Sequence, residues 1–565
     1  MIELHDLSFA YPTPAGPFPV LRNITLTFQE GVSVAILGAN GSGKTPLLRC
    51  LNGLVRPTGG DVCIDGHSVR DPQHISTVRQ RVGMVFQNPD DQIVSAQVER
   101  EVAFGLENLG VPTPDMRRRV ADILDRFDLD RYRRHAPHLL SGGERQRLAL
   151  ASVIAMRPRY LLLDEPTALL DPAGRQDLLT LLAELHTTGE VTPLMVTQIP
   201  SEAVAASRVV VLHRGQIALD GSPSQVFSRD NRLREIGLAP PLAVQIAARV
   251  HLPPPFPLTP NELVSRLPAP SADAAPPEPD PTSPPDTRPI VQTHALRHVY
   301  TPGLPTETLA LNDLDLSIPT GAIVSLIGPS GSGKSTFAQH LNGLLRPTSG
   351  RLTVCDLDLT ALRDFKPLRR RVGLIFQFPE AQLFADTVFD DVAFGPKNLG
   401  LSDLDSRVPE ALQQVGLIPD AYLTRSPLTL SGGEKRRVAI AGVLAMHPDL
   451  LIMDEPTAGL DPSGAREIET LARRLKSDGC TLLVITHDMD LAARLSDRIV
   501  ALQNGRLSFD TTPREAFSDP TRLHALHLDL PEPAHIASAL RTKGWPIPPG
   551  ALTPDALIHH LRQDL

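Results

Sequence analysis

The sequence predicts an α/β fold that is present twice in one chain. The glycine-rich segment GANGSGKT at residues 38–45 returns as GPSGSGKS at residues 328–335, which places Lys44 and Lys334 290 residues apart. Short apolar runs, such as VSVAIL just before the first segment, have the composition of strands that are buried on both sides. An internal repeat of this length implies two complete copies of one domain.

Strands and helices are expected to alternate in each copy. In the first copy an apolar run at 32–37 enters the glycine-rich turn, and a helix should follow. Two further apolar runs, at 160–164 and 209–212, are predicted strands, and the first of them ends in Asp164. Ligands of such sheets bind beyond the carboxyl ends of the strands, so motifs at those ends are candidate site residues.

Composition narrows the class of protein. The chain has 565 residues, 41% of them hydrophobic, which is enough for two large domains. No run approaches the about 20 apolar residues of a membrane-spanning helix, and the N-terminal residues do not resemble a secretory signal. The net charge of -9 argues against a general nucleic-acid binder, and four cysteines without metal-type spacing indicate reduced thiols in a cytosolic protein.

A proline-rich segment separates the two copies. It contains nine prolines in 22 residues and cannot bury a core, so we expect an extended tether. Each copy is followed by a short helical tail, in which Thr259 and Thr553 are expected to cap a helix that begins with proline. The predicted domains are the first copy, its tail, the tether, the second copy and its tail, at 1–227, 228–267, 268–289, 290–517 and 518–565.

The glycine-rich segments predict phosphate binding. Glycines let backbone N–H groups curl around a phosphate, and the following helix offers its positive N-terminus. Lys44 and Lys334 are expected to reach the β- and γ-phosphates, and the hydroxyls of Thr45 and Ser335 to bind Mg²⁺. The alternative is a glycine turn that only lets a helix pack on a strand, and two matches in one chain argue against it.

The pairs Asp164-Glu165 and Asp454-Glu455 form the second repeated motif. Each aspartate lies 120 residues after the lysine of its own copy. An aspartate at a strand end can hold Mg²⁺, and the adjacent glutamate can orient or deprotonate an attacking water. A pair that merely caps the turn before a proline is the alternative, and the shared spacing argues against it.

The third repeated motif is Ser-Gly-Gly, at 141–143 and 431–433. Such a turn, when it opens a helix, is a second N-terminus suited to anions. Taken alone, each serine is more simply explained as an ordinary N-cap.

Together these motifs resemble the nucleotide-binding subunits of ATP-binding cassette transporters, and the resemblance covers nearly all of each copy. It implies tandem duplicated P-loop ATP-binding cassette domains, each with a helical signature subdomain and a short C-terminal tail domain. In that family Ser-Gly-Gly is the signature, which contacts the γ-phosphate held by the opposite cassette. The implied partners are Ser431 and Gly433 for Lys44, Asp164 and Glu165, and Ser141 and Gly143 for Lys334, Asp454 and Glu455.

A narrower resemblance rests on the segments around Gln87 and Gln377. FQNPDDQ with a later VAFG in the first copy has a twin in FQFPEAQLF with a later VAFGP. These segments are similar to the energy-coupling-factor subfamily, which imports vitamins and transition-metal ions such as cobalt and nickel. Its two ATPases are normally separate chains with short C-terminal tails, and here two such units are fused.

The resemblance also implies the role of each site residue. Tyr11 and Tyr300 occupy the position of the aromatic ring that stacks on adenine, with a core tyrosine as the alternative for each. The catalytic residues would be Glu455, His487, Glu165 and Gln198, and the Mg²⁺ ligands Thr45, Gln87, Asp164, Ser335, Gln377 and Asp454. The ATP-binding residues would be Tyr11, Gly38, Asn40, Gly41, Ser42, Gly43, Lys44, Thr45, Gln87, Ser141, Gly142, Gly143, Tyr300, Gly328, Ser330, Gly331, Ser332, Gly333, Lys334, Ser335, Thr336, Gln377, Ser431, Gly432 and Gly433.

The first copy departs from the family pattern at two positions. The family places a histidine after the threonine of the last core strand, where His487 matches and Gln198 does not. Glutamine can donate a hydrogen bond but cannot carry a proton charge. Pro46 stands where the family usually has a second hydroxyl residue, and it offers the α-phosphate neither hydroxyl nor N–H, although proline fits a first helical turn.

These departures predict two unequal sites. The site with Lys334, Glu455 and His487 would do most of the hydrolysis, and the site with Lys44 and Gln198 would bind ATP and turn it over slowly. The alternative is that Gln198 substitutes adequately for histidine.

The implied function is the ATP-hydrolysing motor of an importer, held at the cytoplasmic face of the cell membrane. Its partners would be a transmembrane coupling protein and a substrate-binding membrane protein, with no nucleic acid. The two cassettes are expected to pair within one chain, although pairing between chains stays open. The transported substrate is not readable, because cassettes of this family contact the coupling protein and not the substrate.

Three other functions were considered. A soluble twin-cassette protein that acts on ribosomes typically has a long, charged, helical linker, whereas this tether is short and rich in proline. A chromosome or repair ATPase carries long heptad segments inside the cassette, and the sequence shows none. An exporter motor is disfavoured by the Gln87 and Gln377 segments and by the tails, on resemblance alone.

Overall fold

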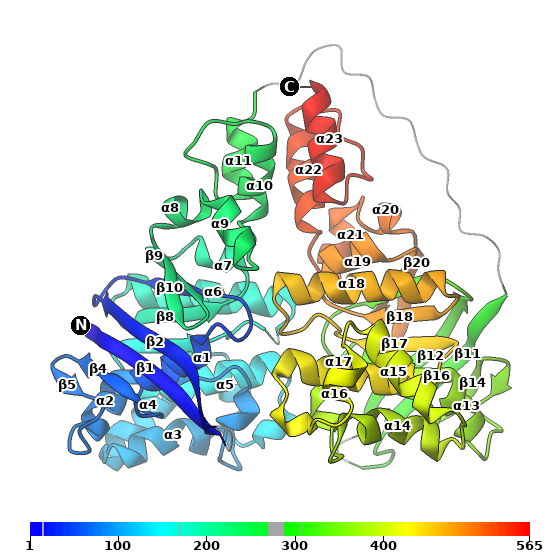
Figure 1. Cartoon of the computed structure of the whole chain (residues 1–565), viewed down its shortest axis with the longest axis horizontal. Coiled ribbons are helices and arrows are strands. Elements are labelled where there is room, and N and C mark those ends of the chain that lie inside the picture. The colour runs from blue at the N-terminus through cyan, green and yellow to red at the C-terminus, as the bar shows by residue number, and fades with distance from the viewer. Residues whose placement is uncertain (14–15, 169, 269–287, 305–306, 565) are drawn as a thin grey trace. The chain divides into compact units, whose positions relative to one another are not determined.

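The computed structural model describes residues 1–13, 16–168, 170–268, 288–304 and 307–564. Their contacts divide the chain into two compact units: the first is built on Met1–Leu267, and the second on Pro268–Ala458 and Ser463–Leu565. Each unit contains two sheets with helices around them (Figure 1). Most of the predicted tether, at 269–287, lies outside the described residues.

The larger sheet of unit 1 has six strands in the order β10-β9-β3-β8-β7-β6. All neighbouring strands are parallel except β10, which pairs antiparallel to β9 at the edge. Every residue of β3, β6 and β7 is buried, as expected for strands covered on both faces. The strands are β3 (Val34–Leu37), β6 (Val82–Val85), β7 (Tyr160–Asp164), β8 (Thr192–Thr197), β9 (Arg208–His213) and β10 (Gln216–Gly221).

The smaller sheet of unit 1 was not anticipated from the sequence. It is antiparallel, in the order β2-β1-β4-β5. Its strands expose one face, and left-handed residues such as Asp6 and Asn23 interrupt the regular pairing of β1 with β2, so no clean alternation of apolar residues marks them. The strands are β1 (Ile2–Thr13), β2 (Gly16–Phe28), β4 (Gly59–Ile64) and β5 (His67–Ser68).

Three sets of helices in unit 1 bear on the motifs and the tail. α1 follows β3 directly, α3 to α5 come between β6 and β7 along the chain and form a helical layer, and α9 to α11 form the tail (Figure 1). The helices are α1 (Lys44–Leu51), α2 (Ile75–Arg81), α3 (Val98–Asn108), α4 (Thr113–Arg126), α5 (Gly142–Ala155), α6 (Pro172–Thr187), α7 (Pro200–Ala203), α8 (Pro223–Phe227), α9 (Asp230–Glu235), α10 (Leu242–Arg249) and α11 (Pro260–Arg266).

Unit 2 repeats this arrangement, with sheets in the orders β16-β17-β18-β13-β19-β20 and β12-β11-β14-β15. Its strands are β11 (Pro289–Tyr300), β12 (Thr308–Pro319), β13 (Ile323–Ile327), β14 (Ser349–Val354), β15 (Leu357–Asp358), β16 (Val372–Ile375), β17 (Leu450–Asp454), β18 (Thr481–Ile485), β19 (Arg498–Gln503) and β20 (Arg506–Thr511). Its helices are α12 (Lys334–Leu341), α13 (Lys366–Arg371), α14 (Val388–Asn398), α15 (Leu404–Gln414), α16 (Pro419–Tyr422), α17 (Gly432–Leu444), α18 (Pro462–Ser477), α19 (Met489–Leu495), α20 (Pro513–Ala516), α21 (Pro520–His524), α22 (Glu532–Thr542) and α23 (Pro554–Asp564).

The caps expected in the two tails are present. The Thr259 hydroxyl accepts a hydrogen bond from the Glu262 N–H at the start of α11. The Thr553 hydroxyl accepts one from the Ala556 N–H at the start of α23. All four cysteines are free, and in the part of the chain described here no helix is long and apolar enough to cross a bilayer.

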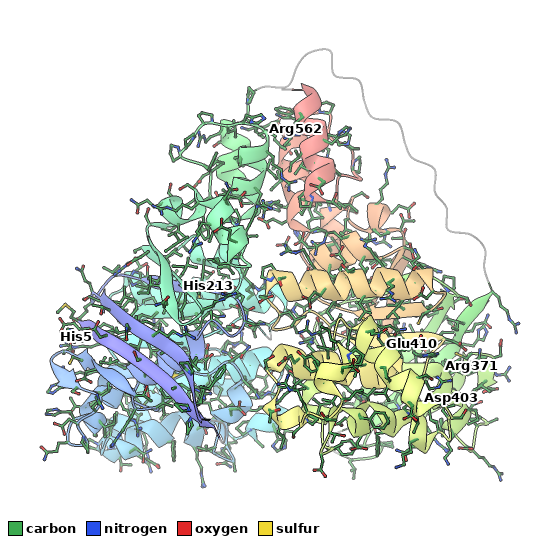
Figure 2. The ribbon with its side chains drawn as sticks, in the orientation of Figure 1. His5, His213, Arg371, Asp403, Glu410 and Arg562 are labelled. Carbon is green, nitrogen blue, oxygen red and sulfur yellow. The ribbon has the colours of Figure 1, made fainter. Side chains whose placement is uncertain are left out.

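The amino ends of the strands in the larger sheet of unit 2 are joined by an ion pair. Arg371 (labelled in Figure 2) is the last residue of α13, and its guanidinium bonds Asp449, next to β17, and the Cys355 carbonyl oxygen. Side-chain hydrogen bonding to Asp449 raises the pKa of Arg371. These contacts tie the start of β16 to the start of β17, whereas the repeated motifs lie at the opposite, carboxyl end of the sheet.

Two carboxylates connect the tail of unit 2 to helix α19. The backbone N–H of Glu532, at the start of α22, donates a 3.1 Å hydrogen bond to Asp490 Oδ1. Burial raises the pKa of both carboxyls. The charge of Asp488 adds to the rise at Asp490, and the charge of Asp490 adds to the rise at Glu532, from 4.5 to about 7. Ser201 and Leu242 occupy the corresponding positions of unit 1, so this pair is confined to the second copy.

We expect this pair to make unit 2 less stable as the pH rises from about 4 to about 7. Because the folded state holds a proton that the unfolded chain has released, stability is greatest below the ordinary pKa and is lost through the raised one. Glu532→Gln should remove the share of this loss that belongs to Glu532, up to about 3 kcal/mol for a pKa that moves from 4.5 to about 7, or about 6–12 °C in melting temperature. Calorimetry from pH 4.5 to pH 8 measures it, with the exposed Asp478→Asn as control; an unchanged pH slope in Glu532→Gln would contradict the assignment.

Candidate nucleotide sites

In unit 1, glycine and lysine determine the conformation of the glycine-rich loop between β3 and α1. Gly43, the N-cap of α1, has φ 105°, which favours glycine. The Lys44 ammonium donates to the carbonyl oxygens of Gly38 (2.7 Å) and Ala39 (3.1 Å). Burial lowers the pKa of Lys44, and the nearby carboxylates of Glu165 and Asp164 oppose that shift. The loop thus holds a cation beside a helix N-terminus, as phosphate binding requires.

Asp164 ends β7 beside the phosphate loop. It is 4% exposed, its side chain bonds Thr45, and its Oδ1 atom has no hydrogen-bond partner among the described residues. Burial raises the pKa of this carboxyl. A buried carboxylate oxygen with free lone pairs next to a hydroxyl suits Mg²⁺, which prefers oxygen ligands and keeps several waters.

Glu165 is the centre of a hydrogen-bond network in unit 1. Gln198 Nε2 donates to Glu165 Oε1 at 2.5 Å and lies 2.9 Å from Asn40 Oδ1. Gln87 Nε2 donates to the other oxygen, Oε2, at 3.0 Å. Burial raises the pKa of Glu165, and the hydrogen bond from Gln198 opposes that shift. Four residues predicted separately from the sequence are therefore in contact.

The phosphate loop of unit 2 has the same geometry. Gly333 has φ 101°, and the Lys334 ammonium donates to the carbonyl oxygens of Gly328 (2.7 Å) and Pro329 (2.9 Å). Asp454 ends β17, and its side chain bonds Ser335. Burial and the adjacent Glu455 charge raise the pKa of Asp454 to about 6.

The partner of the glutamate after the strand end differs in chemistry between the two units. His487 Nδ1 lies 2.8 Å from Glu455 Oε1, and the His487 backbone N–H donates to Glu455 Oε2 at 3.4 Å. Both glutamates follow a strand end directly and have left-handed backbone, with φ 46° at Glu165 and 48° at Glu455. The carboxylate is thus oriented by an amide in one unit and by an imidazole in the other.

The Ser-Gly-Gly motifs open α5 and α17. The hydroxyls of Ser141 and Ser431 each accept a hydrogen bond from the backbone N–H three residues later. The carboxylates of Glu144 and Glu434 accept a hydrogen bond from the backbone N–H of the serine, which completes a capping box. The N-cap function is therefore present in both copies. Gly432 and Gly433 are exposed, and an added Cβ at either would meet nothing within 4 Å, so the start of α17 is open to solvent. Their role as a signature stays a prediction.

Tyr11 and Tyr300 are 38% and 37% exposed. Neither is a core tyrosine, so that alternative is wrong for both. The Tyr300 hydroxyl lies 3.3 Å from Thr336 Oγ1, which joins the ring to the first turn of α12.

One protein-family model matches the chain twice, once in each copy. The model for the ABC transporter family matches residues 21–168 and again residues 311–458. The chain belongs to the ABC transporter family. It is an ABC-type ATPase with two tandem cassettes, and ATP hydrolysis in this family is coupled to transport.

Two curated relatives match nearly the whole chain, and a third matches about half of it. A putative ABC transporter ATP-binding protein of Methanosarcina acetivorans is 35% identical over 97% of this chain and 91% of its own. The putative HMP/thiamine import ATP-binding protein YkoD of Bacillus subtilis is 33% identical over 93% of each chain. The energy-coupling factor transporter ATP-binding protein EcfA2 of Symbiobacterium thermophilum is 49% identical over 47% of this chain and 94% of its own.

Solved structures are similar to single cassettes. cbiO1 of Clostridium perfringens, described as part of the ABC transporter complex cbiONQ, is 35% identical, covers 44% of this chain and 99% of its own, and has a TM-score of 0.38.

Two buried charged residues near the cassette motifs are not among the site residues that the sequence predicts. In the first cassette, the Glu202 carboxylate accepts hydrogen bonds from the hydroxyls of Thr167 (2.7 Å) and Thr197, and so joins the segments after Glu165 and before Gln198. In the second, the Arg436 guanidinium donates to the carbonyl oxygens of Pro456 (2.7 Å) and Ala458 (2.9 Å). Arg436 is one of four consecutive charged residues at 434–437, and Glu202 lies in the four-residue helix α7, so the sequence pattern does not distinguish either of them from a surface charge.

Proposed function

We propose that this ABC ATPase is the motor subunit of an energy-coupling-factor importer for a vitamin or a transition-metal ion. Relatives with this printed role support the proposal: one full-length relative is named for HMP/thiamine import and one cassette-length relative for the energy-coupling factor. The chain would act at the cytoplasmic face of the cell membrane. Its partners would be a transmembrane coupling protein and a substrate-binding membrane protein.

The residues of each site support ATP hydrolysis. Lys44 and Lys334 bind phosphate, and the glutamates accept the proton of an attacking water. Mg²⁺, held by Thr45 and Asp164 or by Ser335 and Asp454, would neutralise charge on the phosphates. ATP binding and hydrolysis then shift a two-state equilibrium between the cassettes, which is how a motor delivers work.

The hydrogen bond from Gln87 to Glu165 is the observation that best supports a membrane partner. Gln87 follows β6 and begins a loop that continues to half-exposed residues before α3. A protein that binds this loop would move an amide in direct contact with the catalytic carboxylate. The geometry therefore connects a docking segment to the hydrolytic centre within one cassette.

The test is an affinity purification of the tagged chain from detergent-solubilised native membranes, with identification of the proteins that copurify. We expect one coupling protein and one small membrane protein, and the latter would identify the cargo. Cross-linking from a cysteine at the half-exposed position Asn88 should capture the coupling protein, whereas a cysteine at the exposed Asp478 should not. Recovery of ribosomes without a membrane partner would replace the proposal with the soluble twin-cassette function.

A further inference from the structure

Two histidines of unit 2 form a buried pair beside Tyr300. His298 lies on β11, two residues before Tyr300, and His340 lies on α12, the helix that follows the phosphate loop. His340 is fully buried, His298 is 8% exposed, and the two rings lie 4.6 Å apart. Neither histidine belongs to the repeated motifs.

The hydrogen bonds determine which ring nitrogens carry protons. His340 Nδ1 lies 2.7 Å from the Thr336 carbonyl oxygen, which only accepts, so this nitrogen must donate. Nε2 of the neutral His340 ring is then an acceptor, and it lies 3.2 Å from His298 Nδ1, which also lies 3.1 Å from the Arg346 carbonyl oxygen. Because a carbonyl oxygen only accepts, His298 Nδ1 carries a proton, and that proton faces both acceptors. Burial lowers the pKa of His340, which favours the neutral ring that this pattern requires.

The pair reaches the nucleotide site at two points. The His298 ring meets the Tyr300 ring edge-on, with centroids 4.6 Å apart and an interplanar angle of 82°. His340 holds the Thr336 carbonyl, while Thr336 Oγ1 lies 3.3 Å from the Tyr300 hydroxyl. The contacts thus form a closed cycle through Tyr300, His298, His340 and Thr336. This cycle holds the Tyr300 side chain against the first turn of α12.

The first cassette lacks this polar cycle. Phe9, Pro46 and Cys50 stand where the second cassette has His298, Thr336 and His340. Phe9 still meets Tyr11 edge-on, with centroids 4.9 Å apart. Pro46 has no hydroxyl to offer Tyr11, so only the apolar half of the support remains.

We propose that His298 and His340 are positioning residues that hold Tyr300 and Thr336 in place for the nucleoside end of ATP. The second cassette then binds ATP more tightly, and selects adenine more strongly, than the first. The physical reason is preorganisation, because a ring and a helix turn that are already fixed lose less freedom when the ligand binds. The inference rests on the proposed ATP site of unit 2 and is independent of any membrane partner.

The test uses the purified full chain and photolabelling with 8-azido-ATP, with labelled peptides of each cassette quantified by mass spectrometry. ATP and UTP serve as competitors, so each cassette yields its own affinity and base selectivity. The double variant His298→Phe/His340→Cys reproduces the first cassette's side chains at these two positions. We expect ATP to protect the second cassette at least about fivefold less well, the low end for one base–aromatic stack, and UTP, which shares only the phosphate contacts, to lose less protection than ATP. The first cassette of the same molecules is the internal control.

Two results would overturn the inference. Equal weakening of ATP and UTP together with a lower melting temperature would show that the histidines only stabilise the fold. Unchanged ATP selectivity in the double variant would show that they do not act on Tyr300. Tyr300→Ala tests the underlying assignment, because loss of ATP selectivity there is required for the histidines to act through this ring. A failure to find a membrane partner leaves all of these measurements valid.

Discussion

Glu455→Gln is expected to lower the ATPase activity of the chain about 10²–10⁴-fold, the range for loss of a general base. Glutamine preserves the shape of the side chain but cannot accept the proton of the attacking water. The partner of Glu455 is an imidazole, which can carry a charge, whereas the partner of Glu165 is the amide of Gln198. We therefore expect Glu165→Gln to lower the same activity less than about threefold, a loss below 1 kcal/mol.

The comparison is made in transport-competent membranes, at ATP concentrations that saturate both variants. Nucleotide binding measured on the same preparations is the control, because the lysines and glycines of both phosphate loops are retained. Equal losses in the two variants would show that the cassettes share hydrolysis, and that Gln198 serves as well as His487.

The sequence predicted those parts of the sites that follow one another along the chain. A glycine-rich turn, its lysine and a carboxylate at a strand end are each read from a few consecutive residues, and the structure brings Lys44, Glu165 and Gln198 together as these motifs suggest. The contacts of the smaller sheet and of Glu202 could not be read in this way. Glu202 meets hydroxyls 35 and 5 residues away, and such pairings depend on the completed fold.

The histidine pair shows the same limit more clearly. His298 and His340 are 42 residues apart, on a strand of the smaller sheet and on the helix after the phosphate loop. A lone histidine in an apolar segment predicts nothing about its partner. Only the folded structure shows that the two imidazole rings lie against each other and that the His298 ring lies against Tyr300.

Exchange of His487 and Gln198 separates the orientation of the glutamate from the charge of its partner. In His487→Gln the amide can donate to Glu455 as Gln198 does to Glu165, so the glutamate keeps its position. What is lost is the protonatable imidazole, and we expect ATPase activity to fall about 10–10²-fold, at or below the range for one transition-state donor.

The reciprocal change, Gln198→His, supplies an imidazole beside Glu165 and should raise turnover by the first cassette. It is measured in a Glu455→Gln background, where the first cassette does most of the remaining hydrolysis. A gain of about fivefold, or about 1 kcal/mol in the barrier, is expected even though Pro46 still withholds a hydroxyl from the nucleotide. No gain would mean that Pro46, or a residue outside this contact, limits the first cassette, and the difference between the sites would then lie in binding and not in the catalytic pair.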